Sequence, residues 1–193
     1  LSKAFGTLPV LSGLTMTLTQ DNVYCLMSPS GSGKSTLLRI LMGLTPPDSG
    51  SVCLYDTETG ASRPLSSLRV SAVFQEDRLC PTFSPFENLS MMLGRTQKQE
   101  NLRQEMLRLL PEECLTRPVS TLSGGMKRRT AILRALLFPS DLLIMDEPFT
   151  GLDADTKEEV IRYVLEKRMN RLLIAATHQP EEAALLGGHI IHL

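Results

Sequence analysis

The sequence lacks several features that would place it in other classes of protein. It has no tryptophan, and aromatic residues make up only 5% of the chain. No apolar stretch approaches the roughly 18 to 20 residues that a membrane-spanning helix needs. The first residues also lack the charged start and apolar core of a signal segment. We therefore expect a chain that reaches a membrane only through a partner.

Neither sign of charge is in excess. The 193 residues contain 20 Lys and Arg against 21 Asp and Glu, so the formal net charge is -1. A near-neutral chain has no overall field that would hold it on DNA, RNA or an anionic membrane. We expect no nucleic-acid partner. No aromatic side chains alternate with the local basic run Lys127 to Arg129, so we interpret that run as a solvated helix face or a subunit contact.

Residues that could form disulfides or bind metal are also few. His189 and His192 have no third ligand nearby, so we interpret them as surface residues of a strand end. The chain starts at Leu1 rather than Met, and we expect one or both of its ends to be trimmed. The four cysteines form no CxxC pair and mostly have apolar neighbours, as buried thiols in a reducing cytoplasm do: Cys25, Cys53, Cys80 and Cys114.

Hydrophobic patterns predict an α/β chain. Apolar residues alternate with threonines over 14–19, which predicts a strand with one buried face. Continuous apolar runs predict buried strands over Val23–Met27, Leu142–Met145 and Leu172–Ala176, and the final residues 190–193 predict a last strand. A helical pattern precedes each of the two later apolar runs. Such alternation is typical of a parallel sheet covered on both faces.

The middle of the chain has a different pattern. Between Pro81 and Pro118 it becomes polar, rich in Gln and helical, including Gln99–Leu110, which we interpret as an inserted helical segment. A chain that is 42% hydrophobic over 193 residues supports one packed domain. The expected division is a single domain over 1–193, with a nucleotide-binding core of about 1–80 and 138–193 and a helical subdomain of about 81–137.

A glycine-rich turn between a predicted strand and a predicted helix is the first candidate binding site. Residues 28–35 match most of the pattern G-x-x-x-x-G-K-[ST], and Lys34 opens a helical pattern that runs to Met42. Glycines let backbone amides face a phosphate, and a helix N-terminus adds its positive end. Lys34 can neutralise the β and γ oxygens of ATP or GTP, and Ser35 can offer its hydroxyl to Mg²⁺. The predicted nucleotide contacts of this loop are Ser28, Pro29, Ser30, Gly31, Ser32, Gly33, Lys34, Ser35 and Thr36.

One position departs from this pattern. Its first glycine is Ser28 here, so we expect the turn at that point to be made by a residue that has a Cβ.

Two adjacent carboxylates end the predicted strand over Leu142–Met145. Asp146 and Glu147 follow directly, at the edge where parallel sheets bind ligands. We assign Asp146 to the magnesium shell. We assign Glu147 to the water that attacks the γ-phosphate, because that step needs a carboxylate within hydrogen-bond reach. A solvated strand end would also explain such a pair taken alone, but the glycine-rich loop in the same chain favours the catalytic interpretation.

A second glycine turn opens a strongly patterned helix. Residues 122–126, Leu-Ser-Gly-Gly-Met, resemble the LSGGQ signature of ABC transporter ATPases, with Met126 in place of the usual glutamine. The order of the glycine-rich loop, this signature and Asp146-Glu147-Pro148 is the order in that family, so the resemblance covers nearly the whole chain. It implies an α/β fold: a P-loop NTPase parallel-sheet core with N-terminal antiparallel strands and an inserted helical subdomain.

The resemblance also implies roles for single residues. Phe5 would stack on adenine, Gln75 would sense the γ-phosphate and magnesium, Asp153 would contact a dimer partner, and His178 would be the switch histidine. The implied catalytic residues are Glu147, His178 and Lys34, and the implied metal ligands are Ser35, Gln75 and Asp146. Beyond the loop, the implied nucleotide contacts are Phe5, Gln75, Ser123, Gly124, Gly125, Met126 and Asp153.

By the same resemblance, the chain is the ATP-hydrolysing subunit of a transporter, uses ATP and Mg²⁺, and lies in the cytoplasm on the inner face of the cell membrane. The signature helix adds a second phosphate-binding helix start to a chain that already has one. In the family that second site serves a partner subunit in a head-to-tail dimer, which we expect here. An integral membrane permease and an extracytoplasmic substrate-binding protein would complete the system.

The family resemblance leaves the type of system open. Residues 74–79, followed by 86–89, are similar to the corresponding region of importer ATPases for nitrate, sulfonates and taurine. Two alternatives remain: an ABC ATPase without a transport role, and a regulatory nucleotide-binding module that does not hydrolyse ATP. Ser28 and Met126 motivate the second alternative.

Overall fold

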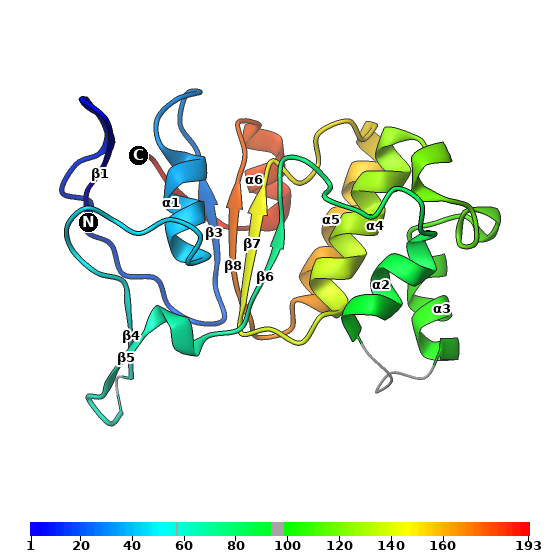
Figure 1. Ribbon diagram of the computed structural model, residues 1–193, viewed down its shortest axis with the longest axis horizontal. Helices are drawn as coiled ribbons and strands as arrows, with labels where there is room; N and C mark the ends of the chain where they lie inside the picture. Colours follow the sequence, from blue (N-terminus) through cyan, green and yellow to red (C-terminus); the bar gives the residue numbers. More distant parts are fainter. Residues whose placement is uncertain (57, 94–98) are drawn as a thin grey trace. The chain divides into compact units, whose positions relative to one another are not determined.

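The computed structural model describes residues 1–56, 58–93 and 99–193, and the chain divides into two units. Unit 1 comprises Leu1–Ala72, Ser140–Asp146 and Asn170–Leu193, and unit 2 comprises Val73–Pro139 and Glu147–Met169. Figure 1 labels their helices and strands along the chain. The expected extent of one domain and of its helical subdomain stays a prediction, and residues 94–98 of that subdomain lie outside the described residues.

A five-stranded sheet in the order β6-β7-β8-β3-β9 forms the centre of unit 1. The pairs β7/β8, β8/β3 and β3/β9 are all parallel. Cys25, Leu143 and Leu173 on these strands are fully buried. The apolar runs therefore form the parallel sheet that the sequence predicts. The strands are β3 (Val23–Leu26), β6 (Val70–Val73), β7 (Leu142–Asp146), β8 (Leu172–Ala176) and β9 (His189–Ile191).

The helices of unit 1 follow the predicted spacing. Leu37, Leu38 and Leu41 lie three or four positions apart and are buried in one apolar cluster with residues of β3, β7 and β8. Gly43 adopts a left-handed backbone, with φ of 70°, directly after the helix cap. The elements are α1 (Lys34–Leu41), α6 (Pro180–Leu186) and a short 3₁₀ turn, η1 (Leu65–Ser67).

Two antiparallel strand pairs accompany the sheet, and the first confirms the predicted antiparallel strands near the N-terminus. They are β1 (Lys3–Phe5) with β2 (Leu8–Leu11), and β4 (Cys53–Tyr55) with β5 (Ser62–Pro64).

The predicted strand over 14–19 is wrong, because these residues form no strand. Leu14, Met16 and Leu18 nevertheless pack on the apolar core, while the threonines between them are exposed. The period of two reports which side chains face the core, whereas a strand also needs a neighbouring backbone to pair with.

Helices make up most of the described part of unit 2, as the predicted helical insertion requires. Met106, Ile132, Leu133 and Val164, from three different helices, are fully buried. α3 ends at Leu107, slightly before the predicted end of that helix. The elements are α2 (Pro85–Leu93), α3 (Gln99–Leu107), α4 (Gly124–Leu137), α5 (Ala154–Lys167), η3 (Glu112–Cys114) and η4 (Val119–Thr121).

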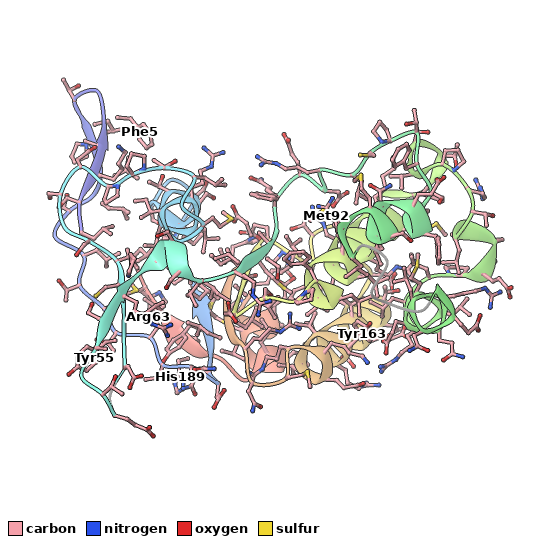
Figure 2. All side chains as sticks on the ribbon, turned by 60° about the horizontal axis from the view of Figure 1, so that its bottom comes forward. Phe5, Tyr55, Arg63, Met92, Tyr163 and His189 are labelled. Carbon is pink, nitrogen blue, oxygen red and sulfur yellow. The ribbon has the colours of Figure 1, made fainter. Side chains whose placement is uncertain are left out.

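A polar cluster joins α3 to α5 within unit 2. The Tyr163 hydroxyl donates to Glu105 Oε2 at 2.9 Å, and the Lys167 ammonium donates to Glu105 Oε1 at 2.5 Å. The Arg108 guanidinium lies over the Tyr163 ring, 4.6 Å from its centroid. Burial, with Glu105 beside it, raises the pKa of the Tyr163 hydroxyl. Figure 2 shows Tyr163 on its helix, α5.

The cysteines are all free thiols, but only two of them, Cys25 and Cys114, are buried. Cys53 is exposed and Cys80 is partly buried, so the expectation of mostly buried thiols holds for half of them. Burial raises the pKa of the Cys25 thiol to about 11. None of the helices within residues 1–56, 58–93 and 99–193 has the length and apolar content that a membrane span requires.

Candidate functional site

The glycine-rich loop connects β3 to α1 in unit 1. Gly33 caps α1 with a left-handed φ of 97°, and a Cβ there would lie 2.9 Å from both Leu11 Cδ2 and the Val10 carbonyl oxygen. Gly31 has a φ of 85° but no atom within 4 Å of where its Cβ would be. Glycine is thus required at position 33 because the backbone is left-handed and because there is no room for a Cβ. At position 31 it is required only because the backbone is left-handed.

Lys34 is buried at the start of α1, only 9% exposed. Its ammonium donates to the carbonyl oxygens of Ser28 and Pro29, the latter at 3.0 Å. α1 begins without a side-chain cap and without an acidic residue in its first turn. The loop therefore combines a positive helix end with a fixed positive charge, which is the chemistry of an anion site.

Two serines complete the loop. The Ser32 hydroxyl is buried, and no group among the described residues hydrogen-bonds to it. Such an unsatisfied buried group is costly unless a ligand binds it. The Ser28 hydroxyl accepts from the Leu193 amide at 2.7 Å, and the backbone of Ser28 does not have a positive φ. Replacing the pattern's first glycine therefore needs no strained backbone.

The sheet brings further predicted residues to the same edge of unit 1 (Figure 1). β7, β8 and β3 are parallel neighbours, so their carboxyl ends lie together. The glycine-rich loop follows β3, Asp146 ends β7, and His178 follows β8. Asp146 is partly buried, whereas Ser35 and His178 are exposed. Carboxylate and hydroxyl oxygens are ligands that suit Mg²⁺.

The turn that carries His178 has a buried support that was not among the predicted site residues. Thr177 is fully buried, and its hydroxyl donates to Glu182 Oε2 at 2.5 Å and accepts from the Gln179 amide at 3.1 Å. Glu182, in the first turn of α6, is only 2% exposed. The sequence feature that could have predicted this contact is an acidic residue at the start of a helix, soon after the Thr177-His178 pair.

Phe5 lies on β1 and is 53% exposed, so it is not a core side chain (Figure 2). The Lys3 ammonium lies 5.6 Å from the centroid of its ring. An exposed aromatic ring is available for stacking on a planar ligand.

Glu147 is the first residue of the second segment of unit 2, one peptide bond after Asp146. Its φ of 48° is left-handed, which is uncommon for a residue with a side chain. Such a conformation costs on the order of 1–3 kcal/mol and is found mostly at functional sites. The Thr150 amide donates to the Glu147 carbonyl oxygen at 3.4 Å across this turn.

The signature residues form the start of α4. The Ser123 hydroxyl caps the helix by accepting from the Met126 amide at 3.3 Å. A Cβ on Gly125 would lie 3.4 Å from Leu152 Cδ2, so the signature packs against the turn that carries Asp153. Asp153 caps α5, and its bond from the Thr156 amide lowers the pKa of its carboxyl group. Unit 2 therefore brings Ser123, Gly124, Gly125 and Asp153 together.

Met126 is anchored in a small apolar cluster of unit 2, formed by Cys114, Val119, Leu122 and Leu79. Its sulfur lies 3.5 Å from Cys114 Sγ. The methionine thus fixes the helix start by packing, where a glutamine would present a polar group. Its contact with a nucleotide stays a prediction.

Gln75 is exposed, two residues beyond β6, and its backbone is held by α4. The Arg128 guanidinium donates to the carbonyl oxygens of Phe74 at 2.7 Å and Gln75 at 2.6 Å. Arg128 is only 7% exposed, so the interpretation of the run at Lys127 as a solvated face is wrong for this residue. This contact could not be predicted, because a run of basic residues does not show which of them points inward.

Comparisons with known proteins find similarity over most of the chain. A family model described as ABC transporter matches residues 11–150. The chain is 36% identical over 194 residues to the aliphatic sulfonates import ATP-binding protein SsuB 2 of Burkholderia cenocepacia, covering 99% of this chain and 70% of that protein. It is 36% identical over 193 residues to the Nod factor export ATP-binding protein I of a Rhizobium species, covering 95% of this chain and 62% of that one.

Solved structures give the same result for the fold. The dimeric structure of MJ0796, described as a bacterial ABC transporter cassette, superposes with a TM-score of 0.82 at 26% identity. The match covers 100% of this chain and 90% of that chain. The α/β fold expected from the sequence, with its parallel-sheet core, N-terminal antiparallel strands and helical insertion, is thereby confirmed.

Proposed function

The chain belongs to the ABC transporter family, and from that premise we propose that it is the ATP-binding and ATP-hydrolysing subunit of a transporter. The observation that carries this proposal is the loop after β3. It combines the buried ammonium of Lys34, the buried hydroxyl of Ser32 and the uncapped start of α1. These groups suit a triphosphate. The names of the relatives, which are ATP-binding proteins, favour ATP over GTP.

Binding of the nucleotide uses mainly unit 1. Backbone amides of residues 29–36 and the Lys34 ammonium bind the β and γ phosphates, and the exposed ring of Phe5 stacks on the adenine. Lys34 exchanges its present contacts with the loop carbonyls for phosphate oxygens. Ser35, Gln75 and Asp146 would hold Mg²⁺, which when bound neutralises phosphate oxygens and orients the γ-phosphate.

Hydrolysis requires a base for the attacking water, and Glu147 supplies it. The water oxygen forms a bond to the γ-phosphorus while its proton passes to the Glu147 carboxylate. The bond from the γ-phosphorus to the bridging oxygen breaks, and ADP leaves with that electron pair. Lys34 stabilises the charge that develops on the phosphates, and His178 hydrogen-bonds the transferred phosphoryl group.

A second copy of the subunit completes each site in this proposal. The start of α4 at Ser123, Gly124 and Gly125 is a further phosphate-binding helix end that the chain's own nucleotide does not need. In a head-to-tail dimer with two-fold symmetry it binds the partner's γ-phosphate, and Asp153 lies at the subunit contact. The dimeric form of the similar cassette supports this arrangement.

The subunit powers an integral membrane permease from the cytoplasmic face of the membrane. The sulfonate relative favours an importer, in which an extracytoplasmic substrate-binding protein delivers the cargo. An export protein has the same identity to this chain, so similarity of sequence does not by itself fix the direction of transport. Co-purification with an integral membrane protein separates this function from that of a non-transport ABC ATPase.

The test of the chemistry is the Glu147→Gln variant. We expect its ATP turnover to fall by about 10²- to 10⁴-fold because the general base is lost, while ATP affinity is kept. The matched control is Glu158→Gln, an exposed carboxylate of α5, which should leave turnover unchanged. Equal turnover in Glu147→Gln and the unmodified chain would support the non-hydrolysing alternative instead.

A further inference from the structure

The segment that carries Gln75 has no regular secondary structure, yet α4 holds its backbone at several consecutive points. Two of these belong to Arg128, whose guanidinium nitrogens bind the carbonyl oxygens of Phe74 at 2.7 Å and of Gln75 at 2.6 Å. The third nitrogen, Nε, lies 3.2 Å from Asp77 Oδ1. One planar side chain thus contacts three neighbouring residues, a geometry that Arg provides and Lys does not.

A second arginine of α4 continues the contact. Arg134 donates to the carbonyl oxygens of Arg78 at 2.7 Å and of Asp77 at 3.1 Å. Together the two arginines bind four carbonyl oxygens over residues 74–78. These bonds replace the strand partners that the backbone no longer has beyond β6.

The contacts of Arg128 contribute more to stability because the side chain is buried. Arg128 is 7% exposed, and the Asp77 carboxyl is desolvated enough that its pKa is raised even though Arg128 opposes the shift. Removing one partner of a buried charged pair costs more than removing one of an exposed pair, because the remaining group is left buried with neither a partner nor water. The arrangement also excludes a nucleic-acid role for Arg128, whose donors already bind the protein backbone.

The position of Arg128 connects two parts of the site. α4 begins at the signature, with Ser123 as its cap, and Arg128 lies in the second turn of the same helix. We propose that Arg128, assisted by Arg134, is a positioning residue that fixes the backbone of Gln75 to the signature helix. The side chain of Gln75 contacts the γ-phosphate and Mg²⁺, and the signature binds the partner's nucleotide. With its backbone fixed in this way, Gln75 moves together with the signature helix. This inference rests on the proposed function of Gln75.

The first experiment needs no nucleotide. Limited trypsin digestion of the unliganded chain should cleave after Arg78 faster in Arg128→Gln, by about tenfold or more, because loss of the guanidinium frees the backbone of residues 74–78. Cleavage after the exposed Arg39 of α1, which belongs to unit 1, should not change. The matched control is Arg103→Gln in α3, whose guanidinium pairs with Glu112 at an exposed position and contacts no residue of this segment. Unchanged cleavage after Arg78 in Arg128→Gln would overturn the inference.

The second experiment is a double-variant comparison of ATP turnover. We expect Arg128→Gln to lower kcat about tenfold without changing ADP affinity, because ADP lacks the γ-phosphate that Gln75 contacts. In a Gln75→Ala background the same substitution should cost less than about twofold, since the residue it positions is already gone. If Arg128→Gln does not fold, Arg128→Lys keeps the buried charge without the planar fork and takes its place.

The outcomes are distinguishable. Equal losses from Arg128→Gln in both backgrounds would assign Arg128 a general structural role and overturn the inference. A Gln75→Ala chain with unimpaired turnover would overturn it as well. Failure of the proposed function would instead appear as an unmodified chain without ATP turnover, whatever the cleavage after Arg78 shows.

Discussion

Units 1 and 2 hold their functional residues by different physical means. In unit 1, the glycine-rich loop, Asp146 and His178 lie at the ends of hydrogen-bonded parallel strands, so main-chain geometry sets their places. In unit 2, Gln75, Glu147 and the signature lie on turns and helix starts held by single side chains or by a strained backbone. Backbone changes should therefore be the most damaging in unit 1, and side-chain changes should be informative in unit 2.

The largest expected effect is in the loop of unit 1. Gly33→Ala adds a Cβ within 2.9 Å of two atoms and forces a left-handed backbone. The backbone costs roughly 1–2 kcal/mol and the overpacking about 1–3 kcal/mol, so we expect the free energy of unfolding in urea to fall by about 3 kcal/mol, with weaker ATP binding.

Gly31→Ala is the matched control for that prediction. It has the same backbone requirement but nothing within 4 Å of the added Cβ. Its free energy of unfolding should fall only by the backbone contribution, roughly 1–2 kcal/mol. Equal losses in the two variants would show that close packing against β2 does not shape the loop.

A smaller effect is expected for the cluster that joins α3 to α5 in unit 2. Tyr163→Phe removes the hydroxyl that donates to Glu105 at 2.9 Å, and we expect the free energy of unfolding to fall by about 1 kcal/mol. The exposed pair of Arg103 with Glu112 is the comparison, because exposed ion pairs contribute about 0–1 kcal/mol and Arg103→Gln should fall near the lower end. If both variants lost the same free energy of unfolding, the burial of Tyr163 would have no energetic consequence.

The difference between the units also explains how much the sequence could predict. The strands β3, β7 and β8 and the helix α1 follow from short apolar runs, glycine positions and helical spacing, all of which are local. Because the carboxyl ends of parallel strands share an edge, those local patterns also indicate that the loop, Asp146 and His178 lie near one another. Their chemical roles remain predictions.

Features that depend on contacts between distant residues could not be predicted in this way. Arg128 contacts carbonyl oxygens more than fifty positions earlier in the chain, and nothing in the run at Lys127 distinguishes the buried arginine from its neighbours. The alternation over 14–19 reports burial correctly but cannot show that no strand lies alongside. The left-handed backbone of Glu147 likewise cannot be predicted from the residue type.

The central claim is that the loop at Lys34 of one copy and the signature of another bind the same ATP. The most direct measurement is the mass in solution of Glu147→Gln, by sedimentation at micromolar concentration with saturating MgATP. We expect a dimer with MgATP, a monomer with MgADP, and a monomer in either nucleotide once Ser123→Arg is added. A chain that stays monomeric with MgATP bound would contradict the shared site.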